Sequence, residues 1–286
     1  MCQLNNIQST INYIKKELEG IYSLRECESV AYILLENVLD YSRTQIQLNK
    51  NESISKEQYN QIRNYISELQ ENKPIQYILG EADFYEMKFK VNRHTLIPRP
   101  ETEELVHAII NENKKEKLNV LDIGTGSGCI PICLAKHLQE ANVTSVDISA
   151  EAIATAKENA EVNQVKVHFF ERDILAWENF EWQQLDIIVS NPPYVTMAEK
   201  EKMEKNVLDF EPHTALFVSN HDPLIFYRRI AELAIAHLKK DGMLYFEINE
   251  SLGKEMIDLL EQRGFSNIKL RQDINGKDRM ISAQKS

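Results

Sequence analysis

The fold of this 286-residue chain is decided by one stretch, Val120-Leu121-Asp122-Ile123-Gly124-Thr125-Gly126-Ser127-Gly128. Its first half is apolar enough for a buried strand, and it leads directly into three glycines at alternate positions. Glycine permits a sharp turn and lets the backbone approach a ligand without a Cβ in the way. Pro131 then falls in the first turn of a predicted helix, where an amide hydrogen would have no partner anyway. The stretch therefore predicts a strand, a ligand-binding loop and a helix, in that order.

The segments around this unit continue the alternation of strands and helices. Apolar runs and helical periodicity predict strands over residues 119–123, 143–147, 165–170, 185–190 and 243–248, helices over 129–138, 149–162, 224–238 and 252–263, and a final antiparallel pair of 267–270 with 279–282. Such alternation is typical of an α/β domain whose parallel sheet is covered by helices on both faces.

Residues 1–73 have the pattern of a small helical bundle instead. Apolar side chains recur there at steps of three and four residues, in three sets: Ile7, Ile11, Ile14 and Leu18; Val30, Ile33, Leu34 and Val38; Tyr59, Ile62, Ile66 and Leu69. We therefore predict a separate helical domain at this end of the chain.

The region after Pro74 reads as a connection between two domains. Short β-type alternation over 76–79, 84–85 and 87–91 predicts a β-hairpin linker within residues 74–93. Two prolines then precede Thr102, which is followed by two glutamates, and we predict that Thr102 caps a helix beginning near residue 102. The second domain accordingly spans residues 94–286.

Composition and charge argue against several functional classes. The 33 basic and 44 acidic residues give a net charge of −11, which argues against broad binding to a nucleic-acid backbone. No apolar run approaches the 18 residues of a membrane span, and the first residues lack the form of a signal peptide. The four cysteines form no CxxC pair and the seven histidines no metal-binding spacing, so we expect reduced thiols, no metal and a cytoplasmic location.

The spacing of the glycines distinguishes between ligand classes. A dinucleotide loop has the spacing G-x-G-x-x-G, and a Walker A loop needs a lysine that does not follow Gly128 here. The observed G-x-G-x-G loop resembles the S-adenosylmethionine loop of class I methyltransferases. Nineteen residues after Gly128, Asp147 ends the next predicted strand, where a carboxylate can accept hydrogen bonds from ribose hydroxyls. The alternative is that the loop is only a tight turn and Asp147 a solvated strand end.

A second motif, Asn191-Pro192-Pro193-Tyr194, follows the predicted strand 185–190. Two prolines remove two backbone donors, fix two φ angles and stiffen the residues before them. A rigid stub at a strand end can present the side-chain carbonyl of Asn191 and the backbone carbonyl of Pro192 beside the ring of Tyr194. Two acceptors and an aromatic face suit a planar –NH₂ group, whose lone pair they can orient toward a sulfonium methyl group. The alternative reading is an ordinary strand-terminating turn.

With these motifs the chain resembles the peptide chain release factor glutamine methyltransferases. The resemblance extends over roughly 74–284 and includes 77–85, 95–103, 210–216, 246–248 and 273–279. It implies a Rossmann-like class I methyltransferase domain with a seven-stranded, mostly parallel sheet, and methylation of the glutamine amide in the Gly-Gly-Gln motif of class 1 release factors. It also implies that the helical domain recognises the substrate, and we expect a monomer that binds neither nucleic acid nor membrane.

The resemblance assigns the site residues. It implies that S-adenosylmethionine is held by Gly124, Thr125, Gly126, Ser127, Gly128, Asp147, Asp173, Ile174 and Asn191, and that the substrate amide meets Asn191, Pro192, Pro193 and Tyr194. Asp173 and the backbone amide of Ile174 take the adenine in this scheme, although Ile174 replaces an aromatic residue of some relatives. Two other functions stay open at this point: a methyltransferase for exocyclic amines of DNA or RNA bases, and a cofactor-binding protein without catalysis.

Overall fold

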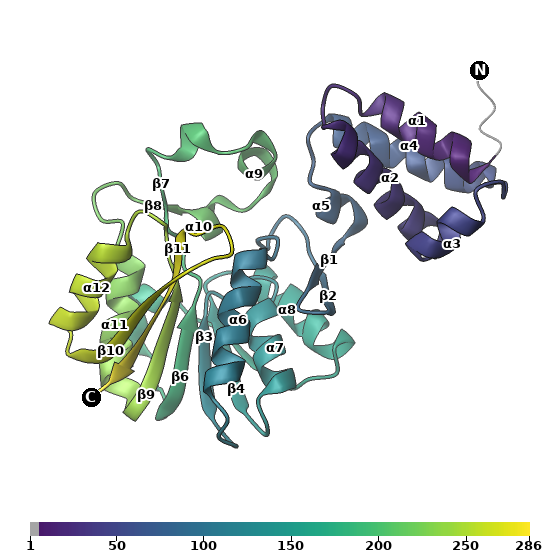
Figure 1. Ribbon diagram of the computed structural model, residues 1–286. Coiled ribbons are helices and arrows are strands. Elements are labelled where there is room, and N and C mark those ends of the chain that lie inside the picture. Colours follow the sequence, from purple (N-terminus) through teal and green to yellow (C-terminus); the bar gives the residue numbers. More distant parts are fainter. Residues whose placement is uncertain (1–5) are drawn as a thin grey trace. The chain divides into compact units, whose positions relative to one another are not determined.

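The computed structural model describes residues 6–286, apart from the side chain at position 202 (Figure 1). The chain forms two compact units. The first comprises the chain up to Gly80 together with Lys205–Phe210, and the second comprises Glu81–Glu204 and Glu211–Ser286. The second unit carries the glycine loop and the Asn-Pro-Pro-Tyr motif.

The first unit is helical, as its apolar periodicity predicts. Its helices are α1 (Ile7–Glu17), α2 (Leu24–Leu39), α3 (Arg43–Leu48), α4 (Lys56–Gln70) and α5 (Ile75–Leu79). Each of the first four begins with a capping box, formed by a side chain that accepts from the third helical amide: Asn6, Ser23, Ser42 and Ser55. All members of the three predicted apolar sets except Ile33 and Tyr59 belong to the core of this unit or pack against it, and Ile33 is exposed. The short helix α3 was not predicted.

The hairpin prediction is partly wrong. Strands β1 (Glu81–Phe84) and β2 (Met87–Lys90) do pair as an antiparallel hairpin, but residues 76–79 belong to helix α5 and not to a strand. Pro74 occupies the N-cap of α5, and Gly80 ends the helix with a left-handed φ of 76°. Apolar residues of α5 pack against the core of the helical unit, so tertiary burial outweighs the local alternation.

The second unit is built on a seven-stranded sheet in the order β10-β11-β9-β6-β3-β4-β5. Its strands are β3 (Asn119–Ile123), β4 (Asn142–Asp147), β5 (His168–Glu171), β6 (Leu185–Ser190), β9 (Leu238–Glu247), β10 (Phe265–Gln272) and β11 (Asp278–Lys285). Strands β5, β4, β3, β6 and β9 are parallel, and β11 is antiparallel to both β9 and β10. The predicted Rossmann-like sheet is thereby confirmed.

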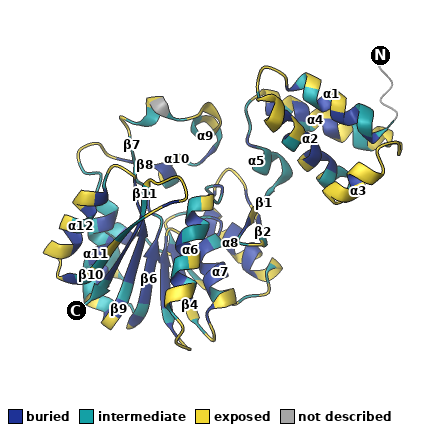
Figure 2. Cartoon of the chain, in the orientation of Figure 1, coloured by how far each residue is buried: buried dark blue, intermediate teal, exposed yellow. Residues whose placement is uncertain are grey.

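Helices cover both faces of this sheet (Figures 1 and 2). They are α6 (Pro100–Glu112), α7 (Cys129–His137), α8 (Ala150–Val162), α11 (Ile225–His237) and α12 (Gly253–Gln262). One core cluster joins the sheet to α11 and α12, and the other joins it to α6 and α7. Figure 2 shows the central strands buried and the outer sides of the helices exposed. The sheet is therefore the buried layer that holds the site rigid.

The prediction that Thr102 caps helix α6 is wrong. The helix begins at Pro100, with Arg99 at the N-cap, and this places Thr102 inside the first turn. Proline suits the first helical position because its φ is already helical and its missing amide hydrogen would have no intrahelical partner. The hydroxyl of Thr102 is thus free to reach across to β9, where it donates to the Glu247 carboxylate.

A long excursion follows β6. Strand β7 (Val195–Thr196) pairs in parallel with β8 (Phe217–Val218), and the chain between them forms the 3₁₀ turn η2 (Lys200–Lys202) and the helices α9 (Lys205–Phe210) and α10 (His213–Leu216). A second 3₁₀ segment, η1 (Ile174–Asn179), follows β5. No bounds were predicted for these short elements, because their sequences carry no clear periodicity.

Substitutions in the glycine loop test how tightly the start of α7 packs against α8. Gly126 and Gly128 both have left-handed φ, so alanine costs about 1–2 kcal/mol at either. A Cβ at Gly126 meets open space, whereas one at Gly128 lies 2.9 Å from Ile132 Cδ1 and 3.0 Å from Ala156 Cβ. We expect Gly128→Ala to lose about 1–3 kcal/mol more than Gly126→Ala in denaturant unfolding. Equal losses would show that α8 yields without cost.

Candidate functional site

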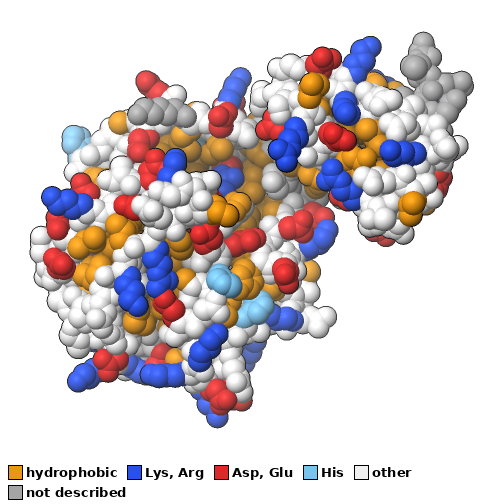
Figure 3. Space-filling view, viewed as in Figure 1, with side chains coloured by type: hydrophobic (Ala, Val, Ile, Leu, Met, Phe, Trp, Pro, Cys, Tyr) orange, Lys and Arg blue, Asp and Glu red, His pale blue; other side chains and the backbone are white. Residues whose placement is uncertain are grey.

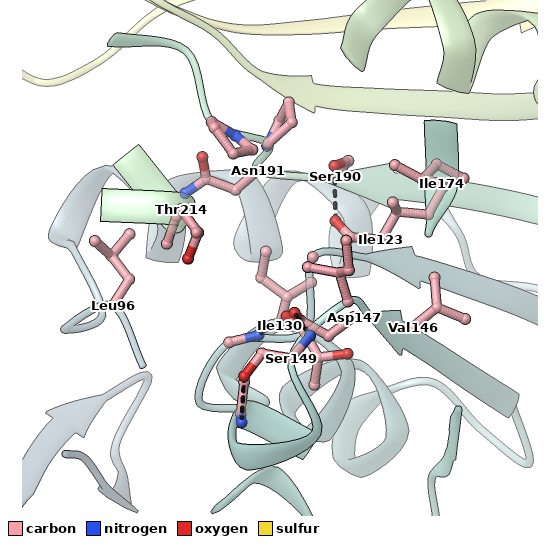
Figure 4. Close-up of a pocket in the computed structure, with 18 of the residues that line it drawn as sticks. Leu96, Ile123, Ile130, Val146, Asp147, Ser149, Ile174, Ser190, Asn191 and Thr214 are labelled. Carbon is pink, nitrogen blue, oxygen red and sulfur yellow. Dashed lines mark hydrogen bonds between the residues drawn. The ribbon is translucent and has the colours of Figure 1, made fainter. Parts of the chain in front are cut away.

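The site lies where the strand order reverses. From β3 the chain continues to β4 and β5 on one side, and later to β6 and β9 on the other. In an open parallel sheet such a reversal leaves a crevice beyond the carboxyl ends of the strands. A cavity of about 390 Å³ occupies that place, within the range of small-molecule sites (Figure 4). All the residues that line it belong to the second unit.

The glycine loop is tied to the neighbouring strand by its own backbone. The amides of Gly124 and Thr125 donate to the carbonyl of Val146, at 2.9 and 3.1 Å, and Gly128 N donates to Thr125 O at 2.8 Å. An added Cβ at Gly124 would lie 3.6 Å from the backbone oxygen of Asn191. The loop therefore brings bare backbone close to the Asn-Pro-Pro-Tyr motif, whereas its glycines predicted only an approach to a ligand.

Buried hydrogen bonds between side chains connect the glycine loop to strands β4 and β3. Ser145 Oγ donates to Asp122 Oδ2 at 2.6 Å, so its oxygen is left to accept from Thr125 Oγ1, also at 2.6 Å. All three side chains are buried. Burial raises the pKa of Asp122 to about 7, against the hydrogen bond from Ser145, which lowers it. No role was predicted for Asp122 or Ser145, because nothing in the local pattern shows which side chains face each other across strands.

Asp147 lies at the end of β4 on the cavity wall and holds two loops at once. Its Oδ2 accepts from Gly126 N and its Oδ1 from Ser149 N, both at 2.9 Å. Figure 4 shows Asp147 and Ser149 on the same side of the cavity. Burial raises the pKa of Asp147, and the backbone donors oppose the shift. Each carboxylate oxygen retains lone-pair capacity for a ligand hydroxyl.

Asp173 and Ile174 line the same wall. Asp173 Oδ1 accepts from Leu175 N at 2.8 Å and caps η1, while Ile174 is 9% exposed and joins the core cluster beside α11. The structure thus places both predicted residues at the cavity. It adds Arg172 and Leu175, which also line it and which sequence reasoning missed.

Three of the four residues of the Asn-Pro-Pro-Tyr motif line the cavity. They are Asn191, Pro192 and Pro193, and Asn191 Nδ2 donates to Thr102 Oγ1 at 3.3 Å. Figure 4 shows Asn191 beside Thr214, across the cavity from Asp147. Tyr194 is not among the residues that line the cavity, and its hydroxyl donates to Glu247 Oε1 at 3.0 Å. The rigidity of the motif stays a prediction, and the hydroxyl of its tyrosine is bound to β9.

One wall of the cavity comes from segments to which the sequence assigned no role. Leu96–Arg99 and Thr214–Phe217 approach from before α6 and from α10. Glu211 joins them, since its carboxylate accepts from Ile97 N at 3.2 Å and from Arg99 Nη2 at 2.5 Å. The Glu211 side chain is 1% exposed and that of Arg99 34%. Both segments were noted only for their resemblance to relatives, because spacing alone cannot show that they meet.

The described part of the chain offers neither a metal site nor a membrane-spanning helix. Residues 6–286 contain no group of three or more His, Cys, Asp or Glu side chains that could hold a metal ion. Within the same range, no helix is both long and apolar enough to cross a membrane.

The raised pKa of Asp122 predicts a pH-dependent stability. Between about pH 4 and pH 7 the folded protein keeps a proton on Asp122 that the unfolded chain releases, so the wild type loses stability across this window relative to Asp122→Asn. The expected relative loss is on the order of 4 kcal/mol, complete by about pH 7. Urea unfolding of both proteins at several pH values measures it. Parallel stability curves would mean that Asp122 ionises as in water.

Comparisons with known proteins agree with this geometry. Residues 101–210 match the family described as Methyltransferase small domain, and residues 10–80 match the PrmC N-terminal domain. The fold is similar to that of a methyltransferase from Pyrococcus furiosus, with a TM-score of 0.53 at 16% identity, covering 78% of this chain and 98% of that one.

The sequence relatives are much closer. A release factor glutamine methyltransferase of Flavobacterium psychrophilum is 51% identical over 92% of this chain and 94% of its own, and one of Bacteroides thetaiotaomicron is 44% identical over 96% and 98%. With this identity over nearly the full length of both chains, the protein belongs to the release factor glutamine methyltransferase family.

Proposed function

We propose that this enzyme transfers a methyl group from S-adenosylmethionine to the side-chain amide nitrogen of the glutamine in the Gly-Gly-Gln motif of class 1 release factors. Relatives that match more than nine tenths of the chain carry the name release factor glutamine methyltransferase. The observation that carries the proposal is one cavity lined by the glycine loop, Asp147, Asn191 and Pro192.

The cavity fits the cofactor that we propose. The bare backbone of Gly124 and Gly126 leaves space that a Cβ would fill, and Asp147 offers two carboxylate oxygens for ribose hydroxyls. Asp173 and the backbone amide of Ile174 are the candidates for the adenine. When bound, S-adenosylmethionine supplies an electrophilic methyl group on a sulfonium centre.

The chain's own residues contribute to the chemistry by orienting the substrate amide and by stabilising charge on its nitrogen. An amide nitrogen is a poor nucleophile, because its lone pair is delocalised into the carbonyl group. In our proposal Asn191 Oδ1 and the backbone oxygen of Pro192 each accept one of the two N–H groups and so fix the plane of the substrate amide. The same two oxygens stabilise positive charge that develops on the nitrogen. The prolines make this arrangement rigid before substrate binds.

Tyr194 stays a predicted substrate contact. We propose that its ring, held through the hydroxyl by Glu247, bounds the place where the substrate amide enters. The hydrogen bond restricts the ring to one orientation, which supports a packing role. The predicted monomeric state and cytoplasmic location also stay predictions.

The acidic balance of the chain supports a protein substrate over a nucleic acid. The net charge is −11, and on the face shown in Figure 3 the basic side chains are intermixed with acidic ones. A broad contact with phosphates would need clustered Lys and Arg. We therefore do not propose methylation of DNA or RNA bases. The assay described below includes nucleic acid, so it would detect such an activity.

Substitution of Asn191 tests the catalytic assignment. Asn191→Ala removes one of the two acceptors, and by analogy with the loss of one oxyanion-hole donor we expect kcat to fall about 10²–10³-fold. Affinity for S-adenosylmethionine should change far less, because Asp147 ends β4 and Asp173 caps η1, away from Asn191. Asn191→Asp keeps an acceptor of the same shape and should retain more activity than the alanine variant.

The assay uses labelled S-adenosylmethionine with purified release factor, and with DNA and RNA in parallel. Near wild-type methylation of the release factor by Asn191→Ala would remove Asn191 from the mechanism. Label that entered nucleic acid and not the release factor would overturn the proposed substrate.

We also propose that the helical unit, predicted as residues 1–73, recognises the body of the release factor. The glycine loop, Asp147 and the Asn-Pro-Pro-Tyr motif all lie in the other unit, while the helical unit has a core of its own. Removal of residues 1–73 should lower kcat/KM on the intact release factor by at least tenfold. It should leave kcat/KM unchanged on a short peptide that contains Gly-Gly-Gln, because a peptide has no further surface to recognise. Calorimetry with S-adenosylmethionine serves as the control for folding, and full kcat/KM on the intact protein would show that the unit is only structural.

A further inference from the structure

A carboxylate with no place in the proposed mechanism lies directly behind the Asn-Pro-Pro-Tyr motif. Glu247 is the last residue of β9 and is 1% exposed. Its Oε2 accepts from Thr102 Oγ1 at 2.6 Å and its Oε1 accepts from the Tyr194 hydroxyl at 3.0 Å. A buried carboxylate is costly unless strong donors satisfy it, so these two hydroxyls are held firmly.

The sheet register explains why these groups meet. Ser190 of β6 pairs with Phe246 of β9, so the next residues along the two parallel strands, Asn191 and Glu247, lie side by side at the carboxyl edge of the sheet. Thr102 reaches the same point from the first turn of α6 and is 3% exposed. Three separate elements therefore converge on one small buried network behind the cavity wall.

The hydrogens in this network can be counted. Burial raises the pKa of Glu247, while the hydroxyls of Thr102 and Tyr194 and the nearby Arg279 oppose that shift and favour the ionised form. The single hydroxyl hydrogen of Thr102 is donated to Glu247 Oε2, at 2.6 Å. The oxygen of Thr102 is then left as an acceptor.

The Thr102 acceptor decides which way the Asn191 amide faces. Oxygen and nitrogen of an Asn side chain occupy nearly equivalent positions, and only the surrounding donors and acceptors choose between them. Asn191 Nδ2 donates to Thr102 Oγ1 at 3.3 Å, which places its nitrogen against α6. Asn191 Oδ1 makes no hydrogen bond to any residue that the structure describes, and it is the oxygen that the proposed mechanism needs.

We propose that Thr102 and Glu247 are positioning residues, which hold the Asn191 amide with its nitrogen toward helix α6 and its oxygen available to the substrate. This inference rests on the proposed function, because it assigns to Asn191 Oδ1 the role of acceptor. Neither residue touches the substrate amide in this scheme. Both act by excluding the flipped amide, in which a donor would face the two N–H groups of the substrate.

Two isosteric substitutions test the inference. Thr102→Val keeps the volume and removes the hydroxyl, and we expect kcat to fall about ten- to a hundredfold with unchanged affinity for S-adenosylmethionine. Thr102→Ser restores the hydroxyl and should return most of the activity. Glu247→Gln keeps the shape but provides an amide that can donate to Thr102, which reverses the network and should lower kcat by a similar factor.

A double-mutant cycle separates positioning from a general loss of stability. If Thr102 acts through Asn191, Thr102→Val should have no further effect on kcat in an Asn191→Ala background. The matched control is Thr155→Val, since the buried Thr155 hydroxyl also accepts from an asparagine, Asn92 Nδ2 at 2.9 Å, but does not line the cavity. We expect the control to lower the thermal midpoint while kcat stays at the wild-type value.

The outcomes are distinct. Additive losses in the cycle, or wild-type kcat in Thr102→Val, would overturn the positioning role while Asn191→Ala still lost activity. An Asn191→Ala enzyme with full activity would remove Asn191 from the mechanism and this inference with it. Label that entered nucleic acid and not the release factor would overturn the proposed function itself. If Glu247→Gln failed to fold, the cycle on Thr102 would still decide the inference.

Discussion

The parallel register of four adjacent strands is the constraint on which this site depends. Ile123 of β3 pairs with Val146 of β4 and with Ser190 of β6, and Ser190 pairs with Phe246 of β9. The next residue on each strand is therefore fixed at one edge of the sheet: Asp147, Gly124, Asn191 and Glu247. Because hydrogen bonds along the whole length of the strands set this alignment, a shift by one residue would turn all four to different neighbours. The site is a consequence of the sheet and not of any single loop.

Polar groups buried beneath that edge make the alignment specific. Asp122, Ser145 and Thr125 form one buried chain under the glycine loop, and Glu247 with Thr102 forms another behind Asn191. Each network would lose more from a misplaced partner than an apolar core would, because an unpaired buried group is costly. The first network joins β3, β4 and the glycine loop, and the second joins β9 to α6. We interpret them as the reason why a cavity with glycine and proline loops can be rigid.

The sequence alone determined the chemistry-bearing elements. The G-x-G-x-G loop after strand 119–123, the acid at the end of the next strand and the Asn-Pro-Pro-Tyr motif after strand 185–190 are all local patterns. Glycine, proline and strand-ending acids act through their own backbone or their immediate neighbours, so spacing along the chain is enough to recognise them. For the same reason the bounds of strands 119–123 and 185–190 were predicted to the residue.

Only the tertiary structure decided how distant segments complete the site. Residues 76–79 alternate like a strand but form helix α5 because their partly buried apolar side chains pack against the helical core. Thr102 looked like a helix cap, yet its hydroxyl belongs to a network with Glu247, 145 residues further on. Glu211 likewise holds Arg99 across 112 residues. Such pairings depend on strand register and helix placement, which arise from packing of the whole chain and leave no signal at any one position in the sequence.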